Sequence, residues 1–282
     1  ITELNTSSND VSGGLAFDGQ RLLLFKNEEG NNDVYESVLN GISWSMPVRK
    51  MGEKLRGGNT EKDETFASYH PADVKVYYIT DGGYSDNKNI YFSGVMNRER
   101  NLWGQGQSAG HEVNTKFQEG SVYIHADGRT MYFSSKGHNT LGGYDIFVSY
   151  LDELGHWGKP INLGYPINTP YDDLFYSATA SSKYAYIASN RAGGEGGLDI
   201  YKVTYKGLSK PMSTDREDQL IASIAKPIGD NSIAEPIFVK EKSLTVFKGK
   251  VIDAVTKEPV FAAIEITLNE TGEIFTSFNS NS

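Results

Sequence analysis

The stretch Asn168-Thr169-Pro170-Tyr171-Asp172-Asp173 decides the fold, because its main features return at a nearly constant interval along the chain. The Asn-Thr dipeptide recurs at steps of 54, 55 and 54 residues, and an acid follows each Asn after five residues. The dipeptides are Asn5-Thr6, Asn59-Thr60, Asn114-Thr115 and Asn168-Thr169, and the acids are Asp10, Glu64, Glu119 and Asp173. A fixed period of this length is typical of repeated architecture.

A second repeated box lies later in each unit, and a tryptophan follows the first three boxes. The boxes are Asp33-Val34-Tyr35, Asn89-Ile90-Tyr91, Asp145-Ile146-Phe147 and Asp199-Ile200-Tyr201, and the tryptophans are Trp44, Trp103 and Trp157. Four copies of one unit therefore fill residues 1 to about 205.

Each unit reads as short strands. Runs of about four to eight apolar, β-branched or aromatic residues are bounded by Gly, Asn and Asp, which is typical of strands. A first and a second strand are joined by a tight turn such as Asp127-Gly128, a third strand begins at the box, and a fourth follows the tryptophan. Four antiparallel strands per unit predict an all-β fold, a β-propeller with one blade per unit.

The two ends of the repeat are complementary. Residues 1–6 precede the first unit in the way that a fourth strand precedes the others, and the last unit stops after Ile200 to Thr204. We expect the N-terminal strand to pair with that last strand and close the ring, which would protect an exposed edge. Four blades are favoured. Five blades remain open as an alternative if residues 210–240 form a degenerate unit.

Length and composition set the domain organisation and exclude some functions. The chain of 282 residues has room for a smaller second module, and the divisions expected are a propeller over 1–206, a linker over 207–243 and the first strands of a β-sandwich over 244–282. The chain begins at Ile1, which we interpret as a processed product or an excised fragment. The sequence contains no cysteine and has a net charge of −9, which argues against thiolate chemistry and nucleic-acid binding. No apolar run is long enough to predict a membrane span.

Two glycine-rich stretches carry a resemblance to a known family. Gly142-Gly143-Tyr144-Asp145-Ile146-Phe147 and residues 189–201 resemble the TolB-like propeller repeats of OmpA-family envelope proteins of Bacteroidota. Residues 247–260 are similar to the opening of a carboxypeptidase-regulatory-like β-sandwich. A propeller followed by this sandwich resembles the middle of OmpA-family peptidoglycan-associated lipoproteins of the type IX secretion system.

The resemblance implies a non-enzymatic protein-interaction scaffold, periplasmic and associated with the outer membrane, without a cofactor. Its implied partners are other envelope or secretion-apparatus proteins, and peptidoglycan would be bound only through a domain that is absent from this chain. The alternative is a carbohydrate-binding or carbohydrate-hydrolysing propeller that uses carboxylates at the channel mouth. Hydrolysis needs two carboxylates with unlike pKa values, and the near-equivalent repeated acids give no sign of that division.

The repeated acids are candidate site residues. If Asp10, Glu64, Glu119 and Asp173 converge at the channel mouth, their oxygens suit a hard cation such as Ca²⁺. Alternatively, each carboxylate accepts backbone N–H bonds in its own inter-blade loop. We favour the second interpretation, because an Asn repeats in step with each acid and suits loop hydrogen bonding. No metal or cofactor is therefore expected.

Other chemical candidates have simpler structural interpretations. His70 and His125 share a repeat position, but Ala16 and Thr179 stand at the same position in the other units, so a third nitrogen ligand for zinc is lacking. We expect a packed or solvent-facing pair of histidines.

The glycine runs 142–143 and 193–197 lead into strands, whereas a phosphate loop leads into a helix. They are expected to allow tight turns with positive φ. Arg191 beside them is expected to stack or to form a salt bridge within its blade. Repetition of the box residues Asp33, Asn89, Asp145 and Asp199 indicates capping rather than catalysis, and the tryptophans are expected to pack between blades.

Overall fold

The computed structural model describes Leu4 and residues 10–27, 30–49, 62–81, 87–97, 102–206, 252–253, 256–267 and 274–279. These residues contain strands and turns but no helix, and none of them forms a helix that could cross a bilayer. The chain divides into two units, residues 1–227 and 228–282. The predicted linker, the alternative fifth blade over 210–240, and the first two Asn-Thr dipeptides lie outside the described residues.

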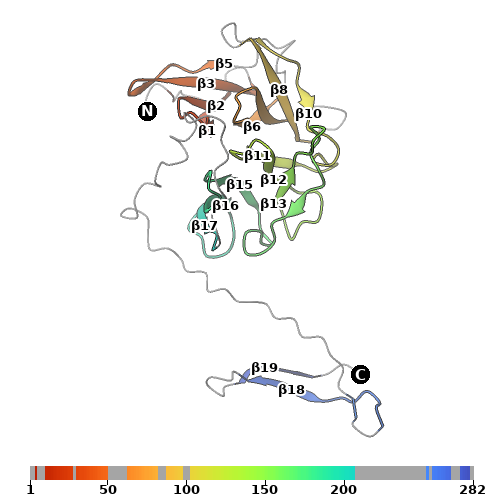
Figure 1. Cartoon of the computed structure of the whole chain (residues 1–282). Helices are drawn as coiled ribbons and strands as arrows, with labels where there is room; N and C mark the ends of the chain where they lie inside the picture. Colours follow the sequence, from red (N-terminus) through yellow and green to blue (C-terminus); the bar gives the residue numbers. More distant parts are fainter. Residues whose placement is uncertain are drawn as a thin grey trace. The chain divides into compact units, whose positions relative to one another are not determined.

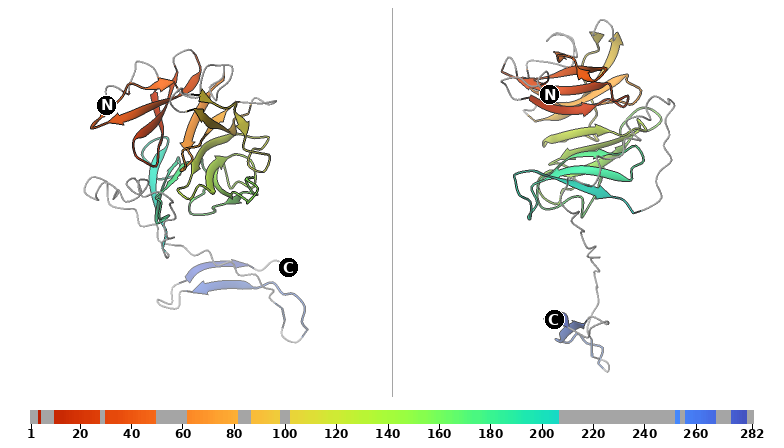
Figure 2. Two further views of the ribbon diagram at one scale, coloured as in Figure 1. Left: turned by 45° about the horizontal axis from the view of Figure 1, so that its top comes forward. Right: turned by 90° about the vertical axis from the view of Figure 1, so that its left-hand side faces the viewer.

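Four antiparallel sheets follow one another in the first unit, one for each predicted blade (Figures 1 and 2). The first contains β1 (Asp10–Leu15), β2 (Arg21–Asn27), β3 (Asn32–Asn40), β4 (Ser43–Trp44) and β5 (Val48–Arg49). The second contains β6 (Glu64–Tyr69), β7 (Lys75–Thr80), β8 (Asn89–Asn97), β9 (Leu102–Trp103) and β10 (Gln107–Ser108). The third contains β11 (Glu119–Ile124), β12 (Thr130–Ser135), β13 (Asp145–Tyr150) and β14 (Ile161–Asn162), and the fourth contains β15 (Asp173–Ala178), β16 (Tyr184–Ser189) and β17 (Asp199–Thr204). The all-β, four-bladed prediction is confirmed.

The inner strand of each blade begins at the repeated acid. The acid is the first residue of the strand in all four blades, and not part of the loop before it. Each inner strand also contains a shift of register against its neighbour. Such a bulge bends the strand, and at Phe66 and Phe175 it places a non-glycine residue at positive φ.

Aromatic side chains fill the centre between opposite blades. The inner strands of successive blades lie side by side, β1 with β6, β6 with β11, and β11 with β15. Phe66 of the second blade meets Phe175 of the fourth edge to face, with ring centroids 4.9 Å apart. Contact between second and fourth blades across the centre is what a small ring of four blades requires.

The predicted tryptophan packing is confirmed at the blade boundaries. Trp103 of the second blade shares a buried cluster with Phe25 of the first. Trp157 of the third blade meets Tyr77 of the second, with ring centroids 5.9 Å apart. Trp44 packs against the cluster that contains Leu4. Because an indole ring buries a large apolar area, Trp103 and Trp157 tie the second blade to the first and the third to the second, whereas Trp44 packs within the first blade.

Among the described residues, the fourth blade has three strands where the others have four or five, and its central strand is less buried. The central strands of the first three blades are buried on both faces, whereas buried and half-buried residues alternate along β16. Of the segment expected to close the ring, only Leu4 is described, and it is buried against Leu24 and Tyr35 of the first blade. Closure by strand pairing stays a prediction.

The second unit contains one described hairpin. Strands β18 (Ala263–Thr267) and β19 (Ile274–Asn279) pair antiparallel. Isolated hairpins are marginally stable, and the predicted β-sandwich stays a prediction.

Candidate functional site at the propeller mouth

At one end of each blade, three polar positions form a row across the strands. In the third blade, Glu119 lies opposite Ser135, which lies opposite Asp145. The second blade has Glu64, Thr80 and Asn89 in the same row, and the fourth has Asp173, Ser189 and Asp199. We call this end of the propeller the mouth.

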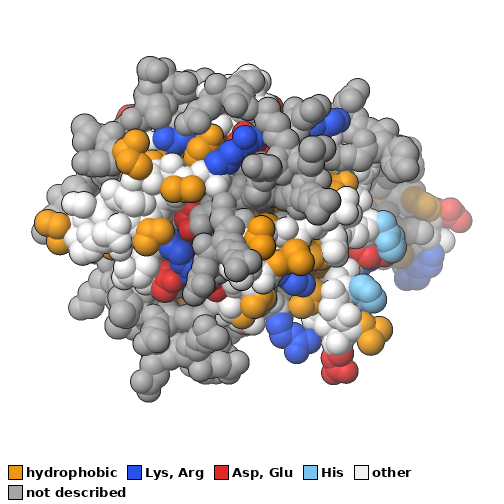
Figure 3. Space-filling view, turned by 90° about the horizontal axis from the view of Figure 1, so that it is seen from above, with side chains coloured by type: hydrophobic (Ala, Val, Ile, Leu, Met, Phe, Trp, Pro, Cys, Tyr) orange, Lys and Arg blue, Asp and Glu red, His pale blue; other side chains and the backbone are white. Residues whose placement is uncertain are grey.

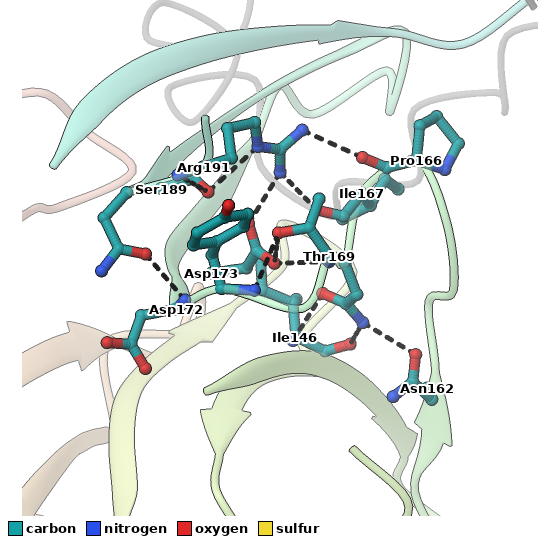
Figure 4. Close-up of polar contacts among 12 residues, drawn as sticks. Ile146, Asn162, Pro166, Ile167, Thr169, Asp172, Asp173, Ser189 and Arg191 are labelled. Carbon is teal, nitrogen blue, oxygen red and sulfur yellow. Dashed lines mark hydrogen bonds and ion pairs between the residues drawn. The ribbon is translucent and has the colours of Figure 1, made fainter. Parts of the chain in front are cut away.

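The Asn of the repeated dipeptide forms hydrogen bonds to the blade that comes before it. The side-chain oxygen of Asn168 accepts the backbone N–H of Ile146 at 2.8 Å, and its NH₂ group donates to the carbonyl of Ile146 at 2.8 Å. The same NH₂ group donates to Asn162 at 2.8 Å (Figure 4). Asn168 is completely buried. Its amide therefore makes the hydrogen bonds to the backbone of Ile146 that water would make at an exposed edge.

The Thr of the dipeptide forms hydrogen bonds to the blade that comes after it. The backbone N–H and the hydroxyl of Thr169 donate to one carboxylate oxygen of Asp173, at 2.6 and 2.8 Å. Asp173 opens the inner strand of the fourth blade. One Asn-Thr dipeptide with its acid therefore joins two successive blades, and we call this arrangement the clasp.

The clasp repeats one blade earlier. Asn114 accepts the backbone N–H of Ile90 at 2.7 Å and donates to its carbonyl at 2.9 Å. The N–H and the hydroxyl of Thr115 donate to Oε1 of Glu119 at 3.2 and 2.9 Å. For these two acids the structure shows the local loop bonding that we favoured from the sequence.

Arg191 reinforces the clasp of the fourth blade. Its guanidinium contacts a carboxylate oxygen of Asp173 at 2.7 Å and the carbonyls of Ile167 and Pro166 at 2.7 and 3.1 Å (Figure 4). It also lies over the ring of Tyr201, 4.7 Å from the centroid. The predicted stacking and salt bridge are confirmed. The positive charge of Arg191 is therefore paired within its own blade.

Glu119 is electrostatically distinct. Its side chain is 0% exposed, and among the described residues Oε2 has no hydrogen-bond partner. Burial raises the pKa of Glu119 to about 7, against the opposing effect of hydrogen bonds from Thr115 and Ser135. The rise comes from desolvation and not from a neighbouring carboxylate. A substrate cannot reach this carboxyl in the structure.

The acids do not gather into a metal-binding group in the described part of the chain. Glu64 accepts a hydrogen bond from the hydroxyl of Thr80 at 3.0 Å within its own blade. No cluster of three His, Cys, Asp or Glu side chains that could hold a metal occurs among the described residues, which do not include the side chain of Asp10. The calcium ring stays an untested alternative to the separate loop contacts that we favour.

The two histidines link hairpin turns at the opposite end. Nε2 of His70 lies 3.2 Å from the carbonyl of Gly128, and Nε2 of His125 lies 3.0 Å from the hydroxyl of Ser182. Each ring therefore reaches the turn of the next blade. Arg21 makes the corresponding link from the first blade to Asp73, at 2.6 Å.

The box residues make local contacts at the mouth. One oxygen of Asp145 accepts the N–H of Leu141 and the NH₂ of Asn162, both at 2.7 Å. Burial raises the pKa of Asp145. Asp199 accepts the N–H of Gly196 at 3.3 Å, and Asp33 pairs with Arg49. Asp33, Asp145 and Asp199 therefore each contact residues of their own blade.

The expectation of positive φ throughout the glycine runs is wrong. Among those glycines only Gly193 has a positive φ, of 95°. A Cβ at Gly142 would strike Pro170, and one at Gly143 would strike the side chain of Asp172. These two glycines are needed because two loops pass close to each other.

Sequence reasoning missed a set of exposed apolar side chains at the mouth of the third and fourth blades. They lie in the loops that begin or end at the repeated polar rows, and we call them the mouth patch. The mouth patch consists of Phe117, Leu141, Tyr165, Tyr171 and Leu198. Phe117 and Tyr171 share the position three residues after the Asn of their units, but Ser8 and Lys62 stand there in the first two units, and the other members share no position. The apolar character is therefore not repeated in every unit, and periodicity gave no signal. Figure 3 shows one face of the molecule, on which exposed apolar side chains lie among charged ones.

Hydrogen bonds fix the loops that carry the mouth patch. The hydroxyl of Tyr144 donates to Gln118 at 3.0 Å, and its backbone N–H donates to Asp172 at 2.9 Å. The N–H of Asp172 donates to the side chain of Asn190 at 2.8 Å. A chain of contacts therefore connects the loops of both blades, which lowers the entropy cost of binding a partner there.

Comparisons with known proteins show a similarity to other propellers, and it is a similarity of fold alone. No protein-family profile matches the sequence, and no curated protein matches it. Among solved structures, TolB from Acinetobacter baumannii has a TM-score of 0.47 and 12% identity, covering 74% of this chain and 46% of that one. A putative TolB from Agrobacterium tumefaciens has a TM-score of 0.45 and 16% identity, covering 71% and 59%.

A chain from a structural study of two prolyl endopeptidases has a TM-score of 0.43 and 12% identity, covering 74% of this chain and 28% of that one. This chain thus spans about half the length of the two TolB structures. Likenesses this distant have no bearing on activity.

Replacing Asn168 by Ala is expected to destabilise the fold by about 2–4 kcal/mol, because it leaves the buried N–H of Ile146 without a partner and removes one of the two donors to its carbonyl, which also accepts the N–H of Leu163. The measurement is urea unfolding. Asn190→Ala is the matched control: it removes one exposed amide contact and is expected to cost about 1 kcal/mol. Equal losses in the two variants would contradict the clasp.

Stability is expected to fall as pH rises from about 4.5 to 7, because Glu119 then ionises in the unfolded chain but keeps its proton in the fold. The loss is about 3 kcal/mol at ~1.4 kcal/mol per pKa unit, and it is complete above the folded pKa. Glu119→Gln should flatten this slope in urea titrations across that range, whereas Glu153→Gln, an exposed control, should not. Parallel curves for parent and Glu119→Gln would rule the effect out.

Calcium is expected to leave thermal unfolding unchanged, because Glu119 and Asp173 are already bonded within the clasps. Melting curves with calcium and with chelator provide the measurement. A stabilisation of several degrees that disappears in Glu64→Gln plus Glu119→Gln would make the acids a metal site by mass action.

Proposed function

We propose that this chain is a non-enzymatic protein-interaction scaffold of the bacterial envelope, periplasmic and associated with the outer membrane in the type IX secretion system. The observation that carries the interaction role is the mouth patch, a set of exposed apolar side chains on loops fixed by hydrogen bonds. Exposed apolar groups clustered on a protein surface are typical of interaction sites. The secretion-system assignment rests on the sequence resemblance.

The chemistry of the mouth supports binding over turnover. The carboxylates with described side chains at the starts of inner strands are buried, and two of them are bonded to Thr side chains in the same way. Catalysis by an acid and a base needs carboxylates in different environments that both reach the substrate. Glu119 has the shifted pKa of a general acid but is 0% exposed.

The partner expected at the mouth patch is another protein with an apolar surface. Tyr165 and Tyr171 offer rings with few rotatable bonds, which bind at low entropy cost. Lys116, whose Nζ lies 5.3 Å from the ring centroid of Phe117, adds a cationic group nearby. An apolar segment flanked by acidic residues fits this mixture of groups.

A photoreactive phenylalanine analogue at Tyr171 is expected to cross-link to an envelope protein when the full-length protein is expressed in its native cells. Tyr150 is the control position, because it is similarly exposed but lies at the other end of its blade. The adduct at Tyr171 should be lost in Leu141→Ser plus Leu198→Ser. Adducts at both positions, or at neither, would contradict the mouth as the docking site.

The secretion role is tested in the same cells. A chain carrying Leu141→Ser plus Leu198→Ser, present at the normal level, should fail to restore secretion when the native gene is deleted. Full restoration would count against the proposal. Release of reducing sugar ends from peptidoglycan by the purified protein would favour the hydrolase alternative.

A further inference from the structure

His70 connects the second and third blades at the end opposite to the mouth. It directly follows β6, and its half-buried ring lies over the turn between β11 and β12. A Cβ at Gly128 of that turn would come within 2.9 Å of Nε2 of His70, and Gly128 has a φ of 66°. The turn therefore needs glycine both for its conformation and for the space that the imidazole occupies.

Both ring nitrogens of His70 have partners of fixed polarity. Nε2 lies 3.2 Å from the carbonyl oxygen of Gly128, which can only accept a hydrogen bond. Nδ1 lies 3.1 Å from the backbone nitrogen of Ala72, whose N–H can only donate. Nε2 therefore carries the proton and Nδ1 is unprotonated. This arrangement fits the neutral imidazole alone, because a second proton on Nδ1 would point at the N–H of Ala72.

His125 holds the same repeat position one blade later, and its surroundings differ in one side chain. Its Nδ1 accepts the backbone N–H of Asp127 at 3.3 Å, as Nδ1 of His70 accepts the N–H of Ala72. A carboxylate oxygen of Asp127 also lies 3.3 Å from Nδ1 of His125. A protonated His125 therefore has an anion within reach of its new N–H, whereas the methyl group of Ala72 offers none.

Two carboxylates near His70 are engaged elsewhere. Asp127 faces the ring from the third blade, but its oxygens accept two backbone N–H groups and one hydroxyl within its own hairpin, at 2.7–2.8 Å. The N–H of Asp73 donates to the carbonyl of His70, and its carboxylate forms a salt bridge to Arg21 at 2.6 Å. Neither carboxylate takes the place that Asp127 has beside Nδ1 of His125.

The surroundings of His70 favour the neutral ring. Burial lowers the pKa of His70 from its ordinary value of 6.5, and the charge of Lys75 acts in the same direction, against the hydrogen bond to Gly128 and the charge of Asp127. The unfolded chain therefore takes up the proton first as pH falls. The stability that neutral His70 contributes is complete above pH ~6.5 and is lost as pH falls below that value.

We propose that His70 is an acid-labile link between the second and third blades, which holds the turn at Gly128 while the imidazole is neutral and loses that contact when Nδ1 is protonated. The link from His125 to Ser182 has a carboxylate beside Nδ1 and stays in place under the same conditions. Acid therefore loosens one blade boundary at this end and leaves the next intact. This inference does not depend on the proposed function.

The first test supplies the carboxylate that His70 lacks. Ala72→Asp is expected to raise the pH of half-protonation of His70 by about 0.5 or more, because an adjacent negative charge favours the protonated ring. NMR of the imidazole ring protons measures this titration, and His70→Gln identifies the signal among the five histidines. Ala72→Asn is the matched control without charge. A midpoint in Ala72→Asp no higher than in Ala72→Asn would overturn the proposal.

The second test measures the link through stability. Glu119 acts in the opposite direction over this pH range, so every chain compared carries Glu119→Gln. The fall in Tm between pH 7 and 5.5 is expected to be about 2 °C smaller with His70→Gln, which keeps a donor but does not titrate. His111→Gln is the control, since the side chain of His111 is 92% exposed. An equal fall in the His70→Gln and His111→Gln chains would overturn the proposal.

The third test locates the loosening. The N–H of Gly128 donates to the carbonyl of His125 at 2.9 Å, and the N–H of Ser182 makes the equivalent bond to Thr179 in the next blade at 2.8 Å. Protection of the Gly128 amide from hydrogen exchange, corrected for the intrinsic effect of pH, is expected to fall several-fold between pH 7 and 5.5. Protection of the Ser182 amide should stay constant. Losses at both amides, or at neither, would overturn the proposal.

Discussion

The pairing of a buried Asn amide with the backbone of the preceding blade is the interaction on which the propeller depends. The fourth strand β14 pairs with β13 at Phe147 and Val148 and does not extend to Ile146. Without Asn168 the N–H of Ile146 would therefore be buried without a partner, at a cost of about 1–3 kcal/mol, and its carbonyl would accept only the N–H of Leu163. Asn168 supplies a donor and an acceptor in one planar group and removes that cost. Its neighbour Thr169 then fixes the start of the next blade.

Because the acid of each described clasp is held by the Thr of the same dipeptide, the repeated acids make poor catalytic candidates. Asp173 receives two bonds from Thr169 and one from Arg191, and Glu119 receives bonds from Thr115 and Ser135. A carboxylate that must hold the same loop in each blade has little freedom to meet a substrate. Specificity in such a scaffold has to come from residues that are not repeated, and the loops of the mouth supply them.

Much of the fold was predictable because every blade is under the same constraints. The strands, their order, the packing of Trp103 and Trp157, and the role of Arg191 follow from patterns that recur or from simple charge chemistry. The direction of the Asn contact did not follow, because Asn168 lies 22 residues from Ile146 and only the fold brings them together. The tight approach of Gly142 to Pro170 was hidden for the same reason. Exposed residues such as Leu141 and Tyr165 have no apolar counterpart at the same position of the other units, so pattern analysis could not find them.

The clasp also makes the repeat in the sequence out of phase with the blade in space. Asn168 belongs by sequence to the fourth unit, yet it completes the third blade. A fragment cut at the unit boundaries, residues 114–167, would therefore contain Ile146 without Asn168 and Asn114 without Ile90. Each cut removes one partner from a contact that is buried in the whole propeller. A single blade that is to be expressed alone or grafted onto another protein must therefore keep the Asn-Thr dipeptide of the following unit.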